Sequence, residues 1–373
     1  MNVRGQPTRT IWATDDVVEI IDQTALPHDF TVRQLRTVAD ATRAIASMQV
    51  RGAPLIGAAA AYGVWLAMRA DPSEDGLQAA CAVLVATRPT AVNLRWALET
   101  MTAALLPLPP GARAAAARAR ADALADEDVA VNRAIGDHAL AVIRGLAEAR
   151  ARETPVNVLT HCNAGWLATV DRGTALSGVY AAHDAGLPVH VWVDETRPRN
   201  QGAALTTWEL GQHGVPHTLI VDNAGGHLMQ RGQVDLVLVG TDRTTATGDV
   251  VNKIGTYLKA LAARDCGVPF YVAAPSSSID WTVADGGEVV IEERAASEVV
   301  ELSGRGAAGT RATVRLAPEG TAVANPGFDV TPARLITGII TERGVAPATR
   351  EGLAALFPSR ASARPTESDE VPA

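Results

Sequence analysis

The sequence predicts an α/β protein with a mainly helical N-terminal part and a C-terminal part built on a parallel β-sheet. Two observations lead to this prediction. Apolar residues recur at helical spacing through residues 51–150, and short apolar runs separated by helix-like segments begin near residue 155. Strands that alternate with helices form parallel sheets with crossover connections. We expect an N-terminal domain over residues 1–135 and a C-terminal domain over residues 136–358.

The composition is that of a globular protein without a basic surface. The 373 residues are 47% hydrophobic and 20% charged, with a net charge of −8. The acidic balance predicts no partner among nucleic acids or anionic membranes. We expect a cytoplasmic protein with reduced thiols, because no signal-peptide-like run opens the sequence and three scattered cysteines suit neither a disulfide framework nor a zinc site.

The elements of the N-terminal part follow from periodicity and punctuation. Strands are expected over residues 10–12 and 17–22, and helices over residues 31–48, 57–68, 90–105 and 112–150. Turns rich in Pro, Gly and Asp separate the helices. The Ala/Arg-rich run 112–150 has the composition of a helix with one solvated face.

The C-terminal part contains five expected strands, over residues 156–160, 189–194, 218–222, 234–239 and 270–274. The fourth strand breaks at Gly240, and we expect the chain to resume as a helix from about Val251. Residues 359–373 are polar and Pro-containing, and are expected to be a disordered tail.

Residues 304–309 match the dinucleotide-binding pattern G-x-G-x-x-G, but their context is wrong. Residues 310–316 alternate as a strand does, so no helix N-terminus is available to hold a pyrophosphate. We discard a nucleotide site here.

Ligands of parallel sheets bind at the carboxyl ends of the strands, which directs attention to Cys162 and Asp242. Cys162 is expected at a helix N-terminus, where the helix dipole lowers a thiol pKa; the alternative is a buried structural cysteine. Asp242 ends the fourth strand, where partial desolvation suits a general acid or base; the alternative is a turn cap. Asp249 fits the cap better, before a helix expected to start near Val250.

Several cations suit a phosphate ligand. Arg51 and Arg88 stand beside short turns before helices, and backbone N–H groups at such positions bind anions. The chain has 31 arginines and only two lysines, Lys253 and Lys259, both in the segment after Asp242. A lysine in so arginine-rich a chain indicates a need for a compact ammonium, although single arginines are usually surface residues.

Six blocks of sequence together resemble the methylthioribose-1-phosphate isomerase family, whose superfamily also includes regulatory subunits of the translation-initiation exchange factor. The resemblance covers about residues 8–356. The blocks are residues 51–54, 88–94, 160–165, 194–198, 248–257 and 325–330.

This resemblance implies a largely helical N-terminal domain, a Rossmann-like C-terminal domain and a homodimer. It implies conversion of 5-methylthioribose 1-phosphate into 5-methylthioribulose 1-phosphate, a step of methionine salvage, without metal or organic cofactor. The catalytic pair would be Cys162 and Asp242. The substrate-binding positions would be Arg51, Gly52, Ala53, Arg88, Gln201, Asn252 and Lys253. Lys259 is left as an ordinary surface residue.

The expected chemistry requires an acid, because phosphate on the anomeric oxygen prevents ordinary ring opening. Asp242 would protonate the ring oxygen. Hydrogen would then move from C2 to C1, either through an enolate with Cys162 as base or as a hydride in a dry pocket; the sequence does not decide between them.

Departures from the family pattern at residues 241–247, Trp166 and Arg95 leave the substrate open. A related sugar 1-phosphate, such as 5-deoxyribose 1-phosphate or ribose 1,5-bisphosphate, is an alternative. A non-catalytic regulatory subunit of the translation-factor type is a second.

Overall fold

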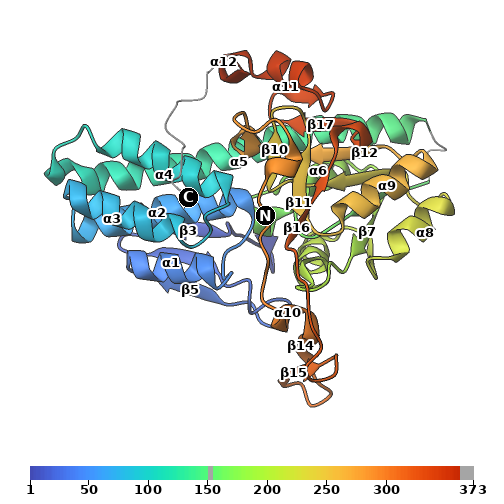
Figure 1. Ribbon diagram of the computed structural model, residues 1–373, viewed down its shortest axis with the longest axis horizontal. Helices are drawn as coiled ribbons and strands as arrows, with labels where there is room; N and C mark the ends of the chain where they lie inside the picture. Colours follow the sequence, from blue (N-terminus) through green and yellow to red (C-terminus); the bar gives the residue numbers. More distant parts are fainter. Residues whose placement is uncertain (150–153, 362–373) are drawn as a thin grey trace.

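The computed structural model describes residues 1–149 and 154–361, and it confirms the predicted fold class. Figure 1 shows the helical N-terminal part beside the large sheet of the C-terminal part. The N-terminal elements are β1 (Asn2–Val3), β2 (Gln6–Pro7), β3 (Ile11–Ala13), β4 (Val18–Ile21), β5 (Val32–Leu35), α1 (Val38–Ala46), α2 (Ala53–Ala70), α3 (Glu74–Val85), α4 (Val92–Leu105) and α5 (Pro110–Glu148).

The prediction of a helix over residues 31–48 was wrong for the first part of that range. Strand β5 occupies Val32–Leu35 and pairs antiparallel with β4, which itself pairs with β3. Helix α1 begins only after a capping box, in which the Thr37 hydroxyl accepts from the Asp40 backbone and the Asp40 carboxylate accepts from the Thr37 backbone. This cap marks the helix start more strongly than apolar periodicity does.

Helix α2 is the centre of the N-terminal part. It packs against α1, α3, α4 and α5. It is also the one described helix long and apolar enough to cross a membrane, but 83% of that stretch is buried inside the fold, as befits a core helix.

Helix α5 runs from the helical part to the sheet (Figure 1). Its first half, including Ala117 and Ala121, belongs to the core around α2. Its second half, including Ile135 and Ile143, belongs to a core on one face of the large sheet. The helix thus changes cores between Ala125 and Ile135, and the domain limit at 135/136 stays a prediction.

The C-terminal elements are more numerous. The helical ones are α6 (Ala175–Asp184), α7 (Thr207–His213), α8 (Ala224–Gln230), α9 (Thr256–Cys266), α10 (Ser297–Val300), α11 (Arg350–Leu356) and α12 (Pro358–Ala361), with short turns Trp166–Ala168, Gly202–Thr206, Ser276–Ser278, Gly286–Glu288 and Ala333–Leu335. The strands are β6 (Val156–Thr160), β7 (Val189–Asp194), β8 (His217–Ile220), β9 (Leu236–Val239), β10 (Arg243–Thr245), β11 (Val250–Lys253), β12 (Phe270–Ala273), β13 (Ile279–Asp280), β14 (Glu301–Arg305), β15 (Arg311–Arg315), β16 (Phe328–Thr331), β17 (Gly338–Thr341) and β18 (Gly344–Ala346).

The large sheet has the strand order β18-β17-β12-β9-β6-β7-β8. All neighbours are parallel except β18, which returns antiparallel to β17. Numbered from β6, the six parallel strands follow the doubly wound order 3-2-1-4-5-6. The order reverses between β6 and β9, so a crevice for ligands is expected at the carboxyl ends of these two strands.

Alternate side chains of the sheet enter different cores. Val158 faces the core of α5 and α6, whereas its neighbour Leu159 faces the core of α8 and α9. The same alternation separates Leu238 from Val239. Both faces are therefore covered by helices, which explains why these strands are continuous apolar runs in the sequence.

The chain after β9 does not resume as a helix near Val251, contrary to expectation. Residues Arg243–Thr245 and Val250–Lys253 form an antiparallel pair, β10 and β11, in a separate sheet of order β13-β10-β11-β16. Strand β11 also pairs with β16, far along the chain. Helix α9 begins at Thr256, after Gly255 at a φ of 104°. Pairing with β16 decides the conformation of this segment.

Two further expectations concern the C-terminal region. Residues 301–315 form a hairpin, β14 with β15, that extends away from the body of the molecule (Figure 1), so the rejected G-x-G-x-x-G match is the turn of a hairpin. The expected disordered tail, residues 359–373, begins inside the short helix α12; residues 362–373 lie outside the described residues.

Candidate active site

Cys162 follows β6 in a left-handed backbone conformation, with a φ of 63°. Its backbone N–H donates to the Thr196 hydroxyl at 2.8 Å, and its carbonyl accepts from the Thr206 hydroxyl at 2.7 Å. Contrary to expectation, no helix begins directly after it, since α6 starts at Ala175. Burial raises the pKa of the Cys162 thiol, against the opposing charges of Arg51 and Lys253. Burial therefore favours the neutral thiol over the thiolate.

Asp242 follows β9, the strand on the other side of the reversal in strand order. Its backbone N–H donates to the Val251 carbonyl at 3.0 Å, which joins it to β11. Burial raises the pKa of the Asp242 carboxyl, and the cations of Arg88, Arg51 and Lys253 oppose the shift. A carboxyl in this environment favours its protonated form, as a general acid must.

One pocket is lined by both Cys162 and Asp242. The N-terminus of α2 forms another part of its wall, because Gly52, Ala53 and Pro54 line it. Gly52 has a φ of 98°, and a Cβ there would lie 2.4 Å from the Ala168 carbonyl oxygen, so the turn requires glycine. The N-terminus of an 18-residue helix directed at this pocket suits an anion.

Arg51 is held at the pocket by a chain of buried polar groups. Its guanidinium donates to both the side-chain and the backbone oxygen of Asn163. Asn163 in turn donates to the Glu209 carboxylate, which also accepts from the Leu167 backbone N–H at 3.2 Å. Burial raises the pKa of Glu209 to about 7, and its hydrogen bonds oppose the shift. These contacts orient Arg51 before any ligand binds.

Arg88 lies outside the pocket lining but close enough for its charge to act on Asp242. Its Nη2 lies 3.3 Å from the Glu292 carboxylate. Its buried Nε has no hydrogen-bond partner among the described residues. Arg88 therefore retains a donor for a ligand.

Asn252 and Lys253 are buried at the end of β11. Asn252 lines the pocket and donates to the Thr256 hydroxyl at 3.0 Å. Burial lowers the pKa of Lys253, and the anionic forms of Cys162 and Asp242 oppose the shift. The fold thus brings both predicted residues close to Cys162 and Asp242.

Gln201 lies in an adjoining cavity of about 230 Å³, which shares Arg51 with the first pocket. Its buried Oε1 has no partner within the described part of the chain. The cavity wall is partly apolar, and its other residues are Gln23, Thr24, Leu26, Met48, Arg199, Ala204, Leu205 and Ser303. The pocket between Cys162 and Asp242 has a free volume of only about 30 Å³.

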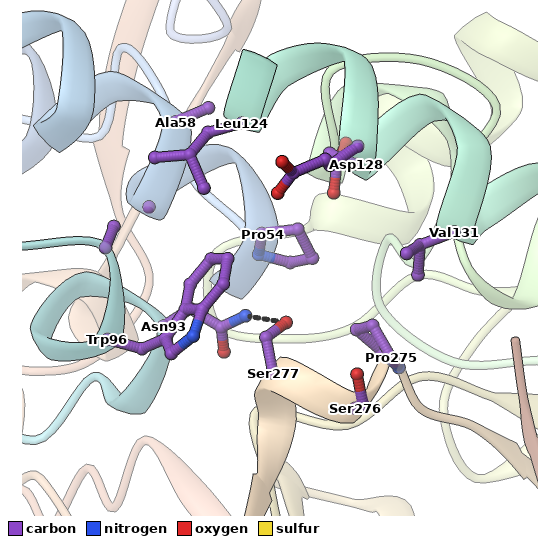
Figure 2. Close-up of a pocket in the computed structure, with 13 residues that line it drawn as sticks. Pro54, Ala58, Asn93, Trp96, Leu124, Asp128, Val131, Pro275, Ser276 and Ser277 are labelled. Atoms are coloured by element: carbon purple, nitrogen blue, oxygen red, sulfur yellow. Dashed lines mark hydrogen bonds between the residues drawn. The ribbon is translucent and has the colours of Figure 1, made fainter. Parts of the chain in front are cut away.

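A second neighbouring cavity, also of about 230 Å³, lies on the other side of Pro54. Figure 2 shows Trp96, Leu124 and Val131 around it, with the Asp128 carboxyl directed inward from α5. Burial raises the pKa of Asp128 to about 7, and a hydrogen bond from the Val170 backbone opposes the shift.

Two assignments in the segment after β9 were wrong. Asp249 does not cap a helix; its carboxylate accepts from the backbone N–H groups of Gly286 at 3.1 Å and Ala333 at 2.8 Å. Lys259 is not a surface residue: it is 4% exposed, and its ammonium lies 3.2 Å from the Asp194 carboxylate.

Asp194 also accepts from His161, and these residues with Asp222 offer ligand atoms within 4.8 Å of one another. Such a set resembles a metal site by residue type, but the Lys259 ammonium already supplies a positive charge to it.

Sequence reasoning missed Asn163, Glu209, Glu292 and Lys259 as neighbours of the site. Asn163 and Asp194 were visible as polar residues at strand ends. Glu209 and Lys259 lie on helices whose buried faces become known only when the helices are packed.

Comparisons with known proteins show the family of this chain. A family model described as the initiation factor 2 subunit family matches residues 49–348. A methylthioribose-1-phosphate isomerase from Rhodospirillum rubrum is 64% identical over 370 residues, covering 97% of this chain and 95% of that protein. Another, from Acidiphilium cryptum, is 62% identical and covers 97% of this chain and 99% of its own length.

Solved structures point to the same family. The 5-methylthioribose 1-phosphate isomerase from Pyrococcus horikoshii OT3 superposes with a TM-score of 0.82 at 40% identity, covering 95% of this chain and 97% of that one. A structure from A. fulgidus, described as translation initiation factor eIF-2B subunit delta, has a TM-score of 0.79 at 40% identity, covering 94% and 100%. The chain belongs to the initiation factor 2 subunit family and, within it, to the methylthioribose-1-phosphate isomerases.

Proposed function

We propose that this protein is an aldose–ketose isomerase that converts 5-methylthioribose 1-phosphate into 5-methylthioribulose 1-phosphate in methionine salvage. One observation carries the proposal: a buried thiol and a buried carboxyl follow the two strands at the reversal of strand order, with three cations around them. Relatives that are 62–64% identical over nearly the whole chain carry the name of this activity.

The phosphate would bind at the N-terminus of α2. The backbone N–H groups there, oriented by Gly52, and the guanidinium of Arg51 offer several donors to one anion. Arg88 and Lys253 would complete its neutralisation. The free Nε of Arg88 supports this role.

Asp242 would act as the acid. It protonates the ring oxygen, and the bond between that oxygen and C1 breaks. Hydrogen then moves from C2 to C1, and the C2 hydroxyl returns a proton to the Asp242 carboxylate as the C2 carbonyl forms. The raised pKa of Asp242 supports a protonated carboxyl at the start of this cycle.

The state of Cys162 bears on how the hydrogen moves. A neutral, buried thiol is a poor base, so the raised pKa of Cys162 supports transfer as a hydride over the enolate route. In the hydride route, Cys162 would stabilise the polarised transition state in a pocket with little room for water.

The adjoining cavity suits a methylthio group at the end of the substrate better than a second phosphate group. Leu26, Met48 and Leu205 give it an apolar wall. Of its two arginines, Arg199 is already paired with the Glu298 carboxylate at 2.7 Å. A substrate would extend from the small pocket past Arg51 into this space.

The departures from the family pattern support the same substrate. The hydroxyl of Thr244 bonds to that of Thr241, and the Thr245 hydroxyl lies 3.1 Å from that of Thr247. Trp166 is buried against Trp208, and Arg95 is exposed. Among these residues only Thr241 lines the pocket of the catalytic pair.

An activity screen tests the proposal. The purified protein is incubated with 5-methylthioribose 1-phosphate, 5-deoxyribose 1-phosphate and ribose 1,5-bisphosphate, and ketose formation is followed by NMR. We expect the highest kcat/KM for the methylthio sugar, and no solvent deuterium at C1 when the reaction is run in D2O. Turnover of the bisphosphate alone would refute the substrate assignment, and deuterium at C1 would refute the hydride route.

We further propose a cytoplasmic homodimer. Sedimentation of the purified chain at twice the monomer mass would support the dimer. Failure to isomerise any of the three sugars, together with a stable complex with translation factors, would favour a regulatory subunit instead.

A further inference from the structure

Lys259 belongs to a buried group of charges behind Cys162 that the proposed chemistry does not use. We call this group the Lys259 cluster; it consists of Lys259, His161, Asp194 and Asp222. The Asp194 carboxylate oxygen Oδ2 lies 3.2 Å from the Lys259 Nζ and 2.9 Å from the His161 Nδ1. Lys259, His161 and Asp194 are 4% exposed or less.

Hydrogen bonds join the members of the cluster. Asp194 Oδ2 accepts from an ammonium, so the carboxylate is an acceptor and His161 Nδ1 must donate to it. His161 Nε2 lies 2.8 Å from the Ile254 carbonyl, which can only accept. Both ring nitrogens of His161 thus face hydrogen-bond acceptors, and its Nδ1 also lies 4.0 Å from the Asp222 carboxylate. The buried Asp194 carboxylate has the Lys259 ammonium as its ion-pair partner. The carboxylate of Asp329 lies nearby and accepts from the backbone of Gly255 and Tyr257.

The cluster joins three loops of the candidate active site. Asp222 accepts from the backbone N–H groups of Thr196 at 2.7 Å and of Arg197 at 2.8 Å. The Thr196 hydroxyl donates to the Asp194 carbonyl and accepts from the Cys162 N–H. Cys162 and Thr196 have φ values of 63° and 67°, a left-handed conformation that non-glycine residues keep only when the surroundings hold them.

The third loop is the turn between β11 and α9. His161 holds the carbonyl of Ile254, the residue after Lys253. The cluster therefore fixes Cys162 relative to a proposed phosphate ligand as well as to Thr196.

The Lys259 ammonium lies beside three groups whose types could hold a metal ion. The ligand atoms of His161, Asp194 and Asp222 lie within 4.8 Å of one another. The space around them is closed: a Cβ at Gly255 would lie 3.0 Å from the His161 ring and 3.7 Å from the Lys259 Nζ. A compact ammonium fits such a site better than a planar guanidinium, which explains a lysine in a chain with 31 arginines.

We propose that Lys259 is a positioning residue: its ammonium holds the Asp194 carboxylate, and through it His161 and Asp222, in place, and thereby fixes the loop that carries Cys162. As a statement about turnover this rests on the proposed isomerase function. The test therefore includes a readout that needs no substrate.

The first variant is Lys259→Ala, which removes the side chain beyond Cβ and leaves space for propylammonium. The matched control is Arg264→Ala, which removes an exposed cation from the same helix. For Lys259→Ala we expect kcat to fall about 100-fold with a KM within threefold of the wild type, because a misplacement of about 1 Å can cost that much. Added propylammonium restores at least a tenth of the wild-type kcat, and propanol restores none. The control keeps wild-type values.

The second readout is alkylation of Cys162 by iodoacetamide, followed by mass spectrometry of the peptide that contains it. We expect at least tenfold faster labelling in Lys259→Ala, reversed by propylammonium, because the loop is no longer held. Unchanged labelling would overturn the proposal, even if the wild type isomerises none of the sugars and the proposed function itself fails.

A charge-balanced variant addresses misfolding. Lys259→Met combined with Asp194→Asn removes one cation and one anion together, so no buried charge is left unpaired. We expect this variant to fold, as circular dichroism would report, to label quickly at Cys162, and to gain nothing from propylammonium. Wild-type kcat and labelling in this variant would overturn the proposal.

Discussion

Replacement of Glu209 by glutamine should change how the stability of the protein depends on pH. Glu209 is 1% exposed and lies behind Arg51, to which Asn163 connects it. Burial raises the pKa of its carboxyl from 4.5 to about 7 in the folded chain, whereas in the unfolded chain it keeps an ordinary value.

The sign follows from proton linkage. An acid whose pKa is higher in the folded state contributes its full stability below the unfolded pKa, and loses it as pH rises through the folded pKa. A shift from 4.5 to about 7 corresponds to roughly 3 kcal/mol in the free energy of unfolding. The wild type should lose this amount between about pH 4.5 and pH 7.

Glu209→Gln preserves the shape of the side chain and resembles the protonated acid in having one acceptor oxygen and one donor group. Urea unfolding, followed by tryptophan fluorescence, is measured for both proteins at pH 5 and pH 8. We expect similar stabilities at pH 5 and a variant that is more stable by about 3 kcal/mol at pH 8. Glu99→Gln, at an exposed helix position, serves as the control. Parallel stability profiles for wild type and Glu209→Gln would refute the reasoning.

Three further predictions concern the surroundings of the site. Asp128→Asn should remove a loss of thermal stability between pH 4 and pH 7 that the wild type shows, because burial raises the pKa of this carboxyl to about 7; identical melting profiles would contradict this. Glu292→Gln removes a negative charge that lies 3.3 Å from Arg88 and helps to raise the pKa of Asp242, the proposed acid. The basic limb of the pH profile of kcat/KM should therefore move to lower pH. An unmoved limb would exclude the influence of Glu292 on Asp242. Gly52→Ala should lower the melting temperature by several degrees and raise KM at least tenfold, because the new Cβ would lie 2.4 Å from a backbone carbonyl oxygen. The control is Gly111→Ala, whose Cβ would meet no described atom within 4 Å. This control should change neither the melting temperature nor KM.

The sequence was informative where structure is local. Strand β6 was predicted with its observed bounds, because a run of apolar and β-branched residues between turns has few other solutions. Cys162 and Asp242 could be selected because residues at the ends of parallel strands converge at one edge of the sheet.

The sequence was misleading where distant segments decide the outcome. Strand β11 consists of two valines followed by Asn252 and Lys253, and β16 pairs with it along its whole length. The burial of Lys259 depends on which face of α9 meets the loop after β7. The left-handed turn at Cys162 depends on the Thr196 hydroxyl of another loop, which accepts from the Cys162 backbone N–H. The pattern of apolar residues within one segment carries no information about contacts with distant segments.

The central claim is that Cys162 and Asp242 together carry out isomerisation of 5-methylthioribose 1-phosphate. The most direct test is single-turnover NMR of ketose formation by the wild type, Cys162→Ser and Asp242→Asn, with folding of each checked by circular dichroism. We predict that the wild type forms 5-methylthioribulose 1-phosphate, and that each folded variant is slower by at least a thousandfold. Near-wild-type conversion by either folded variant would contradict the account.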